Sequence, residues 1–254
     1  MSLKIQYCSD LHLEFYDNNQ LLKTHPIKAV GDILLLAGDI VLFSEMEKHT
    51  TFFDDLSNRF KMVYWIPGNH EYYNFDAINK SGILNERIRD NVFLVNNITI
   101  ELENVRLIFS TLWSKISQVY ENQIAYSLSD FRVIKYNGER LSIGQYNQLH
   151  EDSLNFITNE INKAYEGKTV VVTHHVPTYM NYPEQYRGSA LSEAFTVELF
   201  DLIEASNIDC WIYGHHHSNT PEFIIGKTRM LTNQLGYVRY NEHINFDPTR
   251  LITI

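Results

Sequence analysis

The 254-residue chain is predicted to fold as a four-layer α/β/β/α sandwich, in which two mixed sheets face each other and helices cover their outer sides. Three observations lead to this prediction. Short runs of β-branched and aliphatic residues recur along the chain, segments with helical spacing separate many of them, and tight turns join others. Alternation of strand and helix favours parallel strands, and the turns add antiparallel ones.

The runs expected to form strands fall into two sets. The first set precedes short polar segments and covers residues 4–8, 33–37, 62–66, 169–173 and 210–213. The second set covers residues 92–95, 99–102, 105–109, 222–225, 229–233 and 251–254. Glu103-Asn104 and Gly226-Lys227 provide the turn residues for two hairpins.

Helical spacing of apolar residues occurs in four segments between these strands. They are residues 44–60, 75–89, 149–164 and 191–205, of which 75–89 has the weakest pattern. The least regular part, Leu112 to Asn147, is expected to be a surface insertion in a single domain spanning residues 1–254. The stretch from Pro177 to Ser189 is a second candidate insertion.

The composition limits the function. A formal net charge of −10, from 21 Lys and Arg against 31 Asp and Glu, argues against a surface for extended nucleic acid, which needs clustered positive charge. Only Cys8 and Cys210 occur, both in apolar runs, so we expect no structural disulfide and a cytoplasmic location. Neither a signal peptide nor a membrane span is expected, and the sequence does not indicate an oligomeric state.

Five short polar signatures follow predicted strands, and they hold aspartate, asparagine and histidine but no cysteine. In chain order they are Asp10-Leu11-His12, Gly38-Asp39, Gly68-Asn69-His70-Glu71, Thr173-His174-His175 and Gly214-His215-His216-His217. Hard and borderline divalent cations prefer carboxylate, amide and imidazole ligands. This layout predicts a two-metal hydrolytic site, in which cations roughly 3.5–4 Å apart clamp the attacking and leaving oxygens.

Spacing within the signatures supports a shared site. Asp10 and His12 are two residues apart, as are His215 and His217, and in extended backbone such pairs point to one side. A glycine precedes the polar residues in three signatures, where the chain must turn sharply or let a ligand approach the backbone.

The ordered pattern D-x-H, G-D, G-N-H-[DE], H and G-H-x-H resembles that of the calcineurin-like metallophosphoesterase superfamily, and it extends from Asp10 to His217. The resemblance implies the calcineurin-like phosphoesterase fold and a metal-dependent phosphoester hydrolase, in which a bridging hydroxide attacks phosphorus in line. By the same resemblance, His70 would be catalytic, facing the substrate to stabilise phosphoryl oxygens or to protonate the leaving alkoxide. One metal would be held by Asp10, His12, Asp39 and His217, and the other by Asp39, Asn69, His174 and His215, with Asp39 as the bridge.

The cofactors would be two divalent cations. Borderline ligands suit manganese, iron, zinc or nickel, with manganese favoured. Two such ions, two aspartates and a hydroxide leave a cluster charge of about +1, which attracts a phosphate ester. The expected substrate is a small phosphomonoester or phosphodiester, with nucleotides included because the ions would neutralise their charge.

Departures from individual branches narrow the resemblance. After Asp39 comes Ile40-Val41-Leu42-Phe43, which lacks both the arginine-bearing run of Ser/Thr protein phosphatases and the tyrosine ligand of purple acid phosphatases. Two alternatives remain, a nuclease and a non-catalytic interaction protein on the same fold. Retention of all eight signature positions favours an enzyme.

Several neighbours of the signatures are expected to play lesser roles. His175 and His216 lie beside predicted ligands and should point away from them by strand alternation. Glu71 is expected to orient a loop hydrogen bond or His70. The best candidates for walls of a substrate pocket are Trp113 and Tyr179, whereas the roles of Arg132 and Arg187 stay open.

Overall fold

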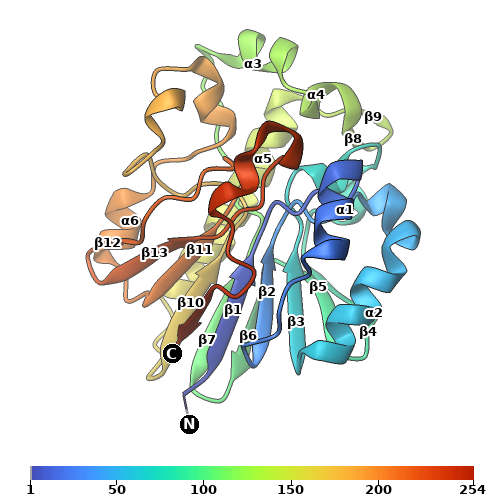
Figure 1. The fold of residues 1–254 in the computed structure, drawn as a ribbon. Coiled ribbons are helices and arrows are strands. Elements are labelled where there is room, and N and C mark those ends of the chain that lie inside the picture. Colours follow the sequence, from blue (N-terminus) through green and yellow to red (C-terminus); the bar gives the residue numbers. More distant parts are fainter. Residues whose placement is uncertain (1) are drawn as a thin grey trace.

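The computed structural model describes residues 2–254 and contains two six-stranded sheets packed face to face, with helices on their outer sides (Figure 1). The predicted four-layer α/β/β/α architecture is confirmed. Each sheet has four parallel strands in its centre and one antiparallel strand at either edge. Both chain termini lie at the same end of the molecule (Figure 1).

The spatial order of the strands differs from their order along the chain in both sheets. The first sheet consists of β14 (Leu251–Thr253), β1 (Lys4–Cys8), β2 (Ile33–Ala37), β3 (Met62–Ile66), β5 (Val92–Asn96) and β4 (Leu84–Arg89). The second consists of β12 (Phe223–Ile225), β13 (Thr228–Thr232), β11 (Cys210–Tyr213), β10 (Lys168–Val172), β7 (Val105–Phe109) and β6 (Ile98–Leu102).

Six α-helices and several 3₁₀ turns connect these strands. The α-helices are α1 (Tyr16–Thr24), α2 (Thr50–Arg59), α3 (Glu121–Ser127), α4 (Asp130–Val133), α5 (Ile143–Ile161) and α6 (Phe200–Ala205). The 3₁₀ turns are Phe43–His49, His70–Tyr72, Ala77–Asn79, Glu184–Tyr186, Ala190–Ala194, Val238–Tyr240 and Glu242–Asn245. Within residues 2–254, no helix combines the length and apolar character that crossing a membrane requires.

The core has three layers because the central strands are buried on both faces. Alternate residues such as Leu35 and Val172 meet between the two sheets. The intervening residues face outward, where Trp65 packs against Phe53 of α2 and Trp211 packs in the layer that holds the helices of the second sheet. Strands buried on both sides are largely apolar, which is why they appeared in the sequence as apolar runs; Gln6 of β1 and Arg106 of β7 are buried polar exceptions.

Three of the four predicted helices are wrong in part or whole. The segment 44–60 begins as the 3₁₀ turn Phe43–His49 and becomes α-helical only in α2. Residues 75–89 contain only a 3₁₀ turn and then β4, an edge strand that pairs antiparallel with β5. Pairing with the open edge of β5 outweighs the weak helical spacing of this segment. Residues 191–205 form a 3₁₀ turn and the short α6 in place of one helix. Thr196, which lies between the two, is extended and forms a β-bridge with Val176.

The segment from Leu112 to Asn147 holds short elements that cover one edge of the sheets. It contains α3, α4 and the hairpin formed by β8 (Lys135–Tyr136) and β9 (Glu139–Arg140). Helix α5 begins inside it, at Ile143, where Ser142 and Gln145 form a capping box. Figure 1 shows α3, α4 and this hairpin at the end of the molecule opposite the two termini.

Candidate metal centre

The five signatures meet at one edge of the two sheets, because each follows the carboxyl end of a parallel strand. Three follow β1, β2 and β3 of the first sheet, and two follow β10 and β11 of the second. Backbone hydrogen bonds join the loops, with Asp10 N donating to Gly38 O at 2.9 Å and Gly214 N donating to His174 O at 3.0 Å. Loops linked in this way can hold side chains in a defined geometry.

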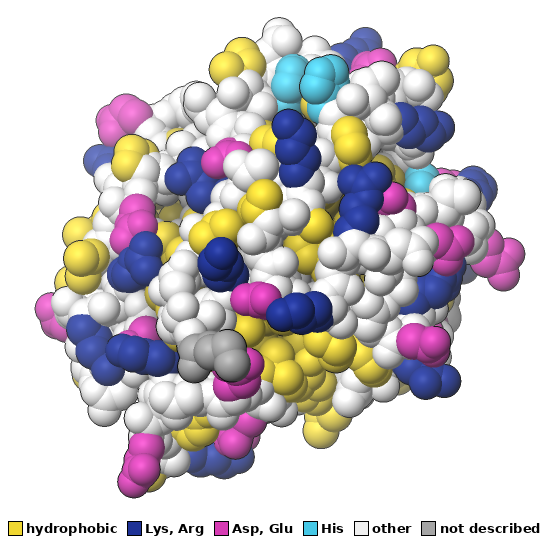
Figure 2. Space-filling model, turned by 60° about the horizontal axis from the view of Figure 1, so that its bottom comes forward, with side chains coloured by type: hydrophobic (Ala, Val, Ile, Leu, Met, Phe, Trp, Pro, Cys, Tyr) yellow, Lys and Arg dark blue, Asp and Glu magenta, His cyan; other side chains and the backbone are white. Residues whose placement is uncertain are grey.

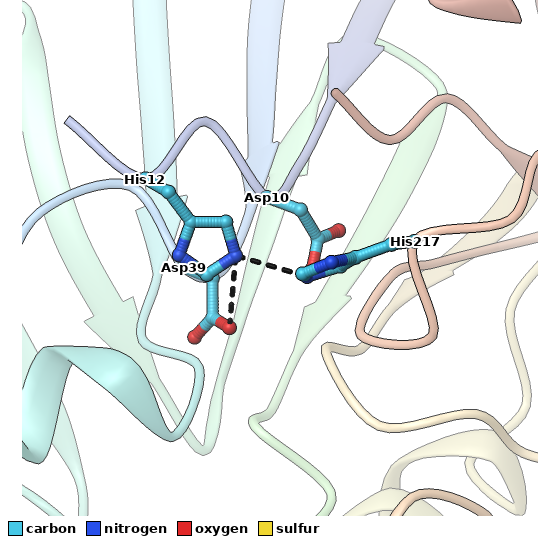
Figure 3. A group of neighbouring side chains, drawn as sticks. All are labelled: Asp10, His12, Asp39 and His217. Carbon is cyan, nitrogen blue, oxygen red and sulfur yellow. Dashed lines mark hydrogen bonds and ion pairs between the residues drawn. The ribbon is translucent and has the colours of Figure 1, made fainter. Parts of the chain in front are cut away.

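The first cluster is formed by Asp10, His12, Asp39 and His217 (Figure 3). One ligand atom from each lies within 4.8 Å of all the others. The Nε2 atom of His12 is 2.9 Å from Nε2 of His217 and 3.7 Å from Oδ2 of Asp39, and His217 Nε2 is 3.4 Å from Oδ1 of Asp10. The structure therefore brings together all four residues predicted for one metal.

The second cluster shares Asp39 with the first and adds His174 and His215. The Nε2 atom of His174 lies 2.9 Å from Nδ1 of His215, 3.4 Å from Oδ1 of Asp39 and 3.3 Å from Oδ1 of Asn69. The two carboxylate oxygens of Asp39 thus face different clusters, Oδ2 toward His12 and Oδ1 toward His174. This is the geometry that a bridging carboxylate needs.

The four clustered histidines share one hydrogen-bond pattern, with one ring nitrogen on an outer acceptor and the other facing the cluster. The outer pairs are His12 Nδ1 with Glu14 Oε1 at 3.0 Å, His217 Nδ1 with Glu242 Oε2 at 2.7 Å, His174 Nδ1 with Ala37 O at 3.0 Å, and His215 Nε2 with Ala194 O at 3.4 Å. These acceptors hold an N–H on the outer nitrogen, so the inner nitrogen is the one that can offer a lone pair to a cation. Four inner nitrogens directed at two clusters that share Asp39 fit metal ions.

The charges in the clusters also fit cations. Burial lowers the pKa of His217, but hydrogen bonds to Asp10 and Glu242 raise it more, to about 10. Burial likewise lowers the pKa of His174, while Asp39 raises it to about 9. The carboxylates therefore hold protons on these two imidazoles at neutral pH, at the positions where a metal ion would replace them.

The backbone of the signatures is left-handed where the sequence predicted it to be extended. The φ angles are 56° at Asp10, 47° at His12, 56° at Asp39, 80° at His215 and 52° at His217. The prediction that alternation in a strand aims these side chains is therefore wrong, although they do converge. Such a conformation costs about 1–2 kcal/mol for each non-glycine residue, and it persists at functional sites where surrounding contacts over-determine it.

Glycines let the loops approach the clusters. A Cβ atom on Gly68 would lie 2.2 Å from Oδ1 of Asp39 and 2.7 Å from Nε2 of His174. A Cβ atom on Gly214 would lie 2.6 Å from Oδ2 of Asp10. All three distances are far below contact distance, so close approach of the backbone explains these two glycines.

Glu71 supports the loops that carry Asp39 and Asn69. Its buried carboxylate accepts four hydrogen bonds, from Asp39 N at 2.9 Å, Gly68 N at 2.7 Å, Ile40 N at 2.7 Å and Trp65 Nε1 at 2.9 Å. Burial and the charge of Asp39 act to raise the pKa of Glu71, whereas the four donors stabilise the anion and act to lower it. With two N–H groups aimed at each oxygen, this geometry fits the ionised form.

His70 lies beside the two clusters and belongs to neither. Its Nδ1 atom is 2.9 Å from Oε1 of Glu14, its Nε2 atom is 3.3 Å from the hydroxyl of Tyr237, and its ring stacks on that of Tyr73 with 4.1 Å between the ring centroids. The same Glu14 oxygen also pairs with His12, so Glu14 joins His70 to the first cluster. His12, Glu14 and His70 form a third group whose ligand atoms lie within 4.8 Å of one another, so the division between His70 and the metal ligands stays a prediction.

Asp130 comes from the Leu112 to Asn147 segment and orients Asn69. Its buried carboxylate accepts hydrogen bonds from Nδ2 of Asn69 at 3.1 Å and from the hydroxyl of Tyr73 at 2.8 Å. Because the Asn69 amide donates to Asp130, its Oδ1 atom faces the second cluster. The segment predicted as a surface insertion therefore reaches into the site.

A cavity of about 400 Å³ opens beside the clusters. Its lining comprises Asp39, Asn69, His70, Tyr73, Ser127, Leu128, Ser129, Asp130, Tyr182, Tyr186, Ser189, Leu191, Ser192, Phe195, His215, His216, His217, Tyr237 and Glu242. Apart from the predicted metal ligands, most of the lining comes from two segments. One is the loop region after the Thr-His-His signature, and the other is the insertion.

The predicted pocket walls lie elsewhere. Trp113 is buried in the core against Tyr72 and Tyr146, because the chain turns inward before reaching the cavity, so its prediction as a wall is wrong. Tyr179 and Arg187 border an adjoining depression, which shares Tyr182, Ser189 and Ser192 with the cavity. Arg132 is exposed and donates to the carbonyl of Tyr126 and the hydroxyl of Ser129.

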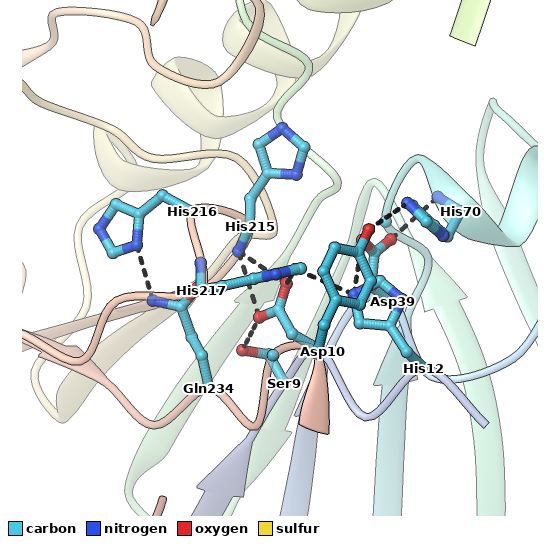
Figure 4. Close-up of polar contacts among 12 residues, drawn as sticks. Ser9, Asp10, His12, Asp39, His70, His215, His216, His217 and Gln234 are labelled. Carbon is cyan, nitrogen blue, oxygen red and sulfur yellow. Dashed lines mark hydrogen bonds and ion pairs between the residues drawn. The ribbon is translucent and has the colours of Figure 1, made fainter. Parts of the chain in front are cut away.

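The two spare histidines face away from the clusters. His216 turns toward Gln234, whose Nε2 atom is 2.9 Å from its Nδ1 (Figure 4), although the residue still borders the cavity. His175 is buried, with Nε2 3.3 Å from the hydroxyl of Tyr146. Neither belongs to a group of side chains within residues 2–254 that could hold a metal.

Four residues that contact the site were missed in the sequence. Glu14 stands two residues after His12 and could have been included as part of the same loop. Asp130, Tyr237 and Glu242 are distant from every signature along the chain, and no local pattern marks them.

Comparison with known proteins agrees with this geometry. The sequence matches the family described as calcineurin-like phosphoesterase over residues 3–219. An uncharacterized protein of Acanthamoeba polyphaga mimivirus is 33% identical over 276 residues, which cover 98% of this chain and 96% of the relative.

Two solved structures share the fold. A phosphopantetheinyl hydrolase from Mycobacterium tuberculosis has a TM-score of 0.72 at 17% identity, over 98% of this chain and 95% of that one. A dimetal phosphatase from Danio rerio has a TM-score of 0.53 at 15% identity, over 99% and 91% of the two chains. The family match extends over most of the sequence and includes the loops that form both clusters. The chain therefore belongs to the calcineurin-like phosphoesterase family and is a metal-dependent phosphoester hydrolase.

Proposed function

We propose that the protein hydrolyses a small phosphomonoester or phosphodiester at two divalent cations. One cation would be held by Asp10, His12, Asp39 and His217, and the other by Asp39, Asn69, His174 and His215. The observation that carries this proposal is the arrangement of four imidazoles, each with one nitrogen on an outer acceptor and the other facing a cluster that contains Asp39. When bound, the cations supply positive charge for the phosphoryl oxygens and an activated water nucleophile.

His70 is the proposed proton donor and phosphoryl contact. Its Nδ1–H is directed to Glu14, so Nε2 is the nitrogen that faces the cavity, beside the hydroxyl of Tyr237. Burial lowers the pKa of His70, but the carboxylates of Asp39 and Glu14 raise it above the ordinary value. A protonated imidazole at this position can donate Nε2–H to a phosphoryl oxygen or to the leaving alkoxide.

We propose manganese as the metal that supports turnover, because the ligands are nitrogen and oxygen atoms without a thiolate. We also propose a small soluble substrate in the cytoplasm, with neither extended nucleic acid nor a membrane as partner. The net charge of −10 supports this choice. On the face shown in Figure 2, Lys and Arg side chains are interspersed with acidic and hydrophobic ones.

The substrate panel for a first assay follows from chemistry and likeness. p-Nitrophenyl phosphate tests monoester hydrolysis, and bis-p-nitrophenyl phosphate tests diester hydrolysis. Because the Mycobacterium structure is of a phosphopantetheinyl hydrolase, a phosphopantetheinyl ester is the third compound.

The test compares metal content and turnover in the wild type and two matched variants. Asp39→Asn removes the charge that both clusters share, so we expect it to lose metal and at least 100-fold in turnover, on the order of 3 kcal/mol of transition-state stabilisation. Asp32→Asn is the control, because Asp32 pairs with Lys61 at 2.7 Å outside the clusters. Failure of the reconstituted wild type to bind metal or to hydrolyse any panel compound would refute the proposal.

A further inference from the structure

The cavity beside the clusters has two chemically different sides. Toward the predicted metals it is bordered by histidine, aspartate and asparagine side chains. The rest of the lining is mainly apolar and hydroxylic. Its apolar residues are Tyr73, Leu128, Tyr182, Tyr186, Leu191 and Phe195, of which Tyr73 and Phe195 stack on His70 and His215, and four serines add hydroxyls.

No lysine or arginine of residues 2–254 lines this cavity. Its two remaining acids are already engaged, Asp130 with Asn69 and Tyr73, and Glu242 with His217 at 2.7 Å. The nearest arginine along the insertion, Arg132, is exposed and bonded to Tyr126 and Ser129. Arg187 borders the adjoining depression and does not line the cavity itself. Among the described residues that line the cavity, only protonated imidazoles would therefore add positive charge to that of the two metal ions.

A second phosphate on the substrate would have no cationic partner among the described residues that line this cavity. Sites that bind several phosphates use arginine, lysine or backbone N–H groups for each of them. Transfer of an anion from water to an apolar wall without such a partner is strongly unfavourable. Serine hydroxyls and aromatic rings instead suit an uncharged group with an apolar body and a few hydrogen-bonding atoms.

We infer that the alcohol esterified to the reacting phosphate is uncharged, and that the enzyme discriminates against substrates carrying a further phosphate. This inference rests on the proposed function and specifies its substrate class. A cavity of about 400 Å³ has the size of a site for a small organic group. Monoesters and diesters both satisfy the inference when their alcohol parts are neutral.

The test uses two compounds that differ by one phosphate. Thymidine 5′-(p-nitrophenyl phosphate) and the same compound phosphorylated on its 3′ oxygen are assayed by nitrophenol release with the manganese-loaded protein. We expect kcat/KM to be at least fivefold lower for the compound with the additional phosphate. A smaller difference, or a preference for that compound, would overturn the inference.

A charge-insertion pair tests the cause of the discrimination. Ser127 lines the cavity at an exposed position, so longer side chains fit there. Ser127→Arg should improve the relative kcat/KM of the 3′-phosphorylated compound at least threefold over Ser127→Gln, which adds length without charge. If the ratio of kcat/KM for the two compounds is the same in both variants, the lack of a cation is not the cause of the discrimination. No hydrolysis of either compound or of p-nitrophenyl phosphate would instead refute the proposed function, and the inference with it.

Discussion

Replacement of Glu71 by glutamine tests how the loops of the centre are held. The wild-type carboxylate accepts four hydrogen bonds, two on each oxygen. Glutamine keeps one accepting oxygen but places an NH₂ group against the other two donors, which leaves two buried N–H groups without an acceptor. At about 1–3 kcal/mol for each stranded group, and about 1 kcal/mol for the lost charge on the remaining bonds, the free energy of unfolding should fall by about 3–7 kcal/mol.

The assay is thermal and urea unfolding of metal-free protein in chelator, followed by circular dichroism. For a chain of this size, at about 2–4 °C per kcal/mol, the loss corresponds to a decrease in Tm of about 6–28 °C. Glu151→Gln is the matched control, because Glu151 pairs with Lys115 at the surface and such pairs contribute about 1 kcal/mol or less.

If Glu71→Gln changes the free energy of unfolding by less than about 1 kcal/mol, the reasoning is refuted. Such a small change would mean that Glu71 is already protonated in the wild type, so that the neutral amide replaces a neutral carboxyl. The pH dependence provides an independent check. If the folded-state pKa were about 8, against an ordinary value of 4.5, the carboxyl would reduce wild-type stability as pH rises from 4.5 to 8. An ionised, four-fold hydrogen-bonded Glu71 predicts no such decrease relative to Glu71→Gln.

Four further outcomes are expected. His70→Asn should keep both metal ions by elemental analysis but lose about 10²–10⁴-fold in turnover, and loss of metal would instead make His70 a ligand. Loading two divalent ions at pH 7 should release about two protons, because the pKa values of His217 and His174 are raised to about 10 and 9. Calorimetry in buffers of different ionisation enthalpy measures the number of protons released. Metal binding without proton release would contradict the prediction. Glu14→Ala should lower metal affinity by about 10–100-fold, and unchanged affinity would exclude Glu14 as support for His12. Burial lowers the pKa of His150, so the neutral form is favoured in the fold and stability should decrease as pH falls below about 6.5; this decrease should be smaller in His150→Gln, and an equal one would assign it to other groups.

Much of the fold was predictable because its physical cause is local. The central strands are buried on both faces, so their apolar runs stand out in the sequence. Residues 75–89 show the limit of this approach, since their helical spacing is weak and the open edge of β5 decides their structure. Pairing partners of edge strands lie far away in the chain, and a local pattern does not report them.

The candidate site shows the same division. Asp39 and the other predicted ligands could be found because polar residues directly after buried strands are conspicuous. The positions of Glu242 and Asp130 could not, because only folding brings them to His217 and Asn69. Trp113 was misplaced for a related reason, since an aromatic residue after a strand can turn toward the core or toward a cavity.

By itself, the sequence determined the layer architecture, the order of the five signatures and the residue types that suit two cations. These follow from the period of burial along strands and from ligand chemistry, which are properties of short segments. Only the tertiary structure decided how the ligands are aimed, through left-handed backbone at Asp10, His12 and Asp39, and which distant residues border the cavity. Those features depend on hydrogen bonds between loops of different strands, and such contacts exist only after the two sheets have packed together.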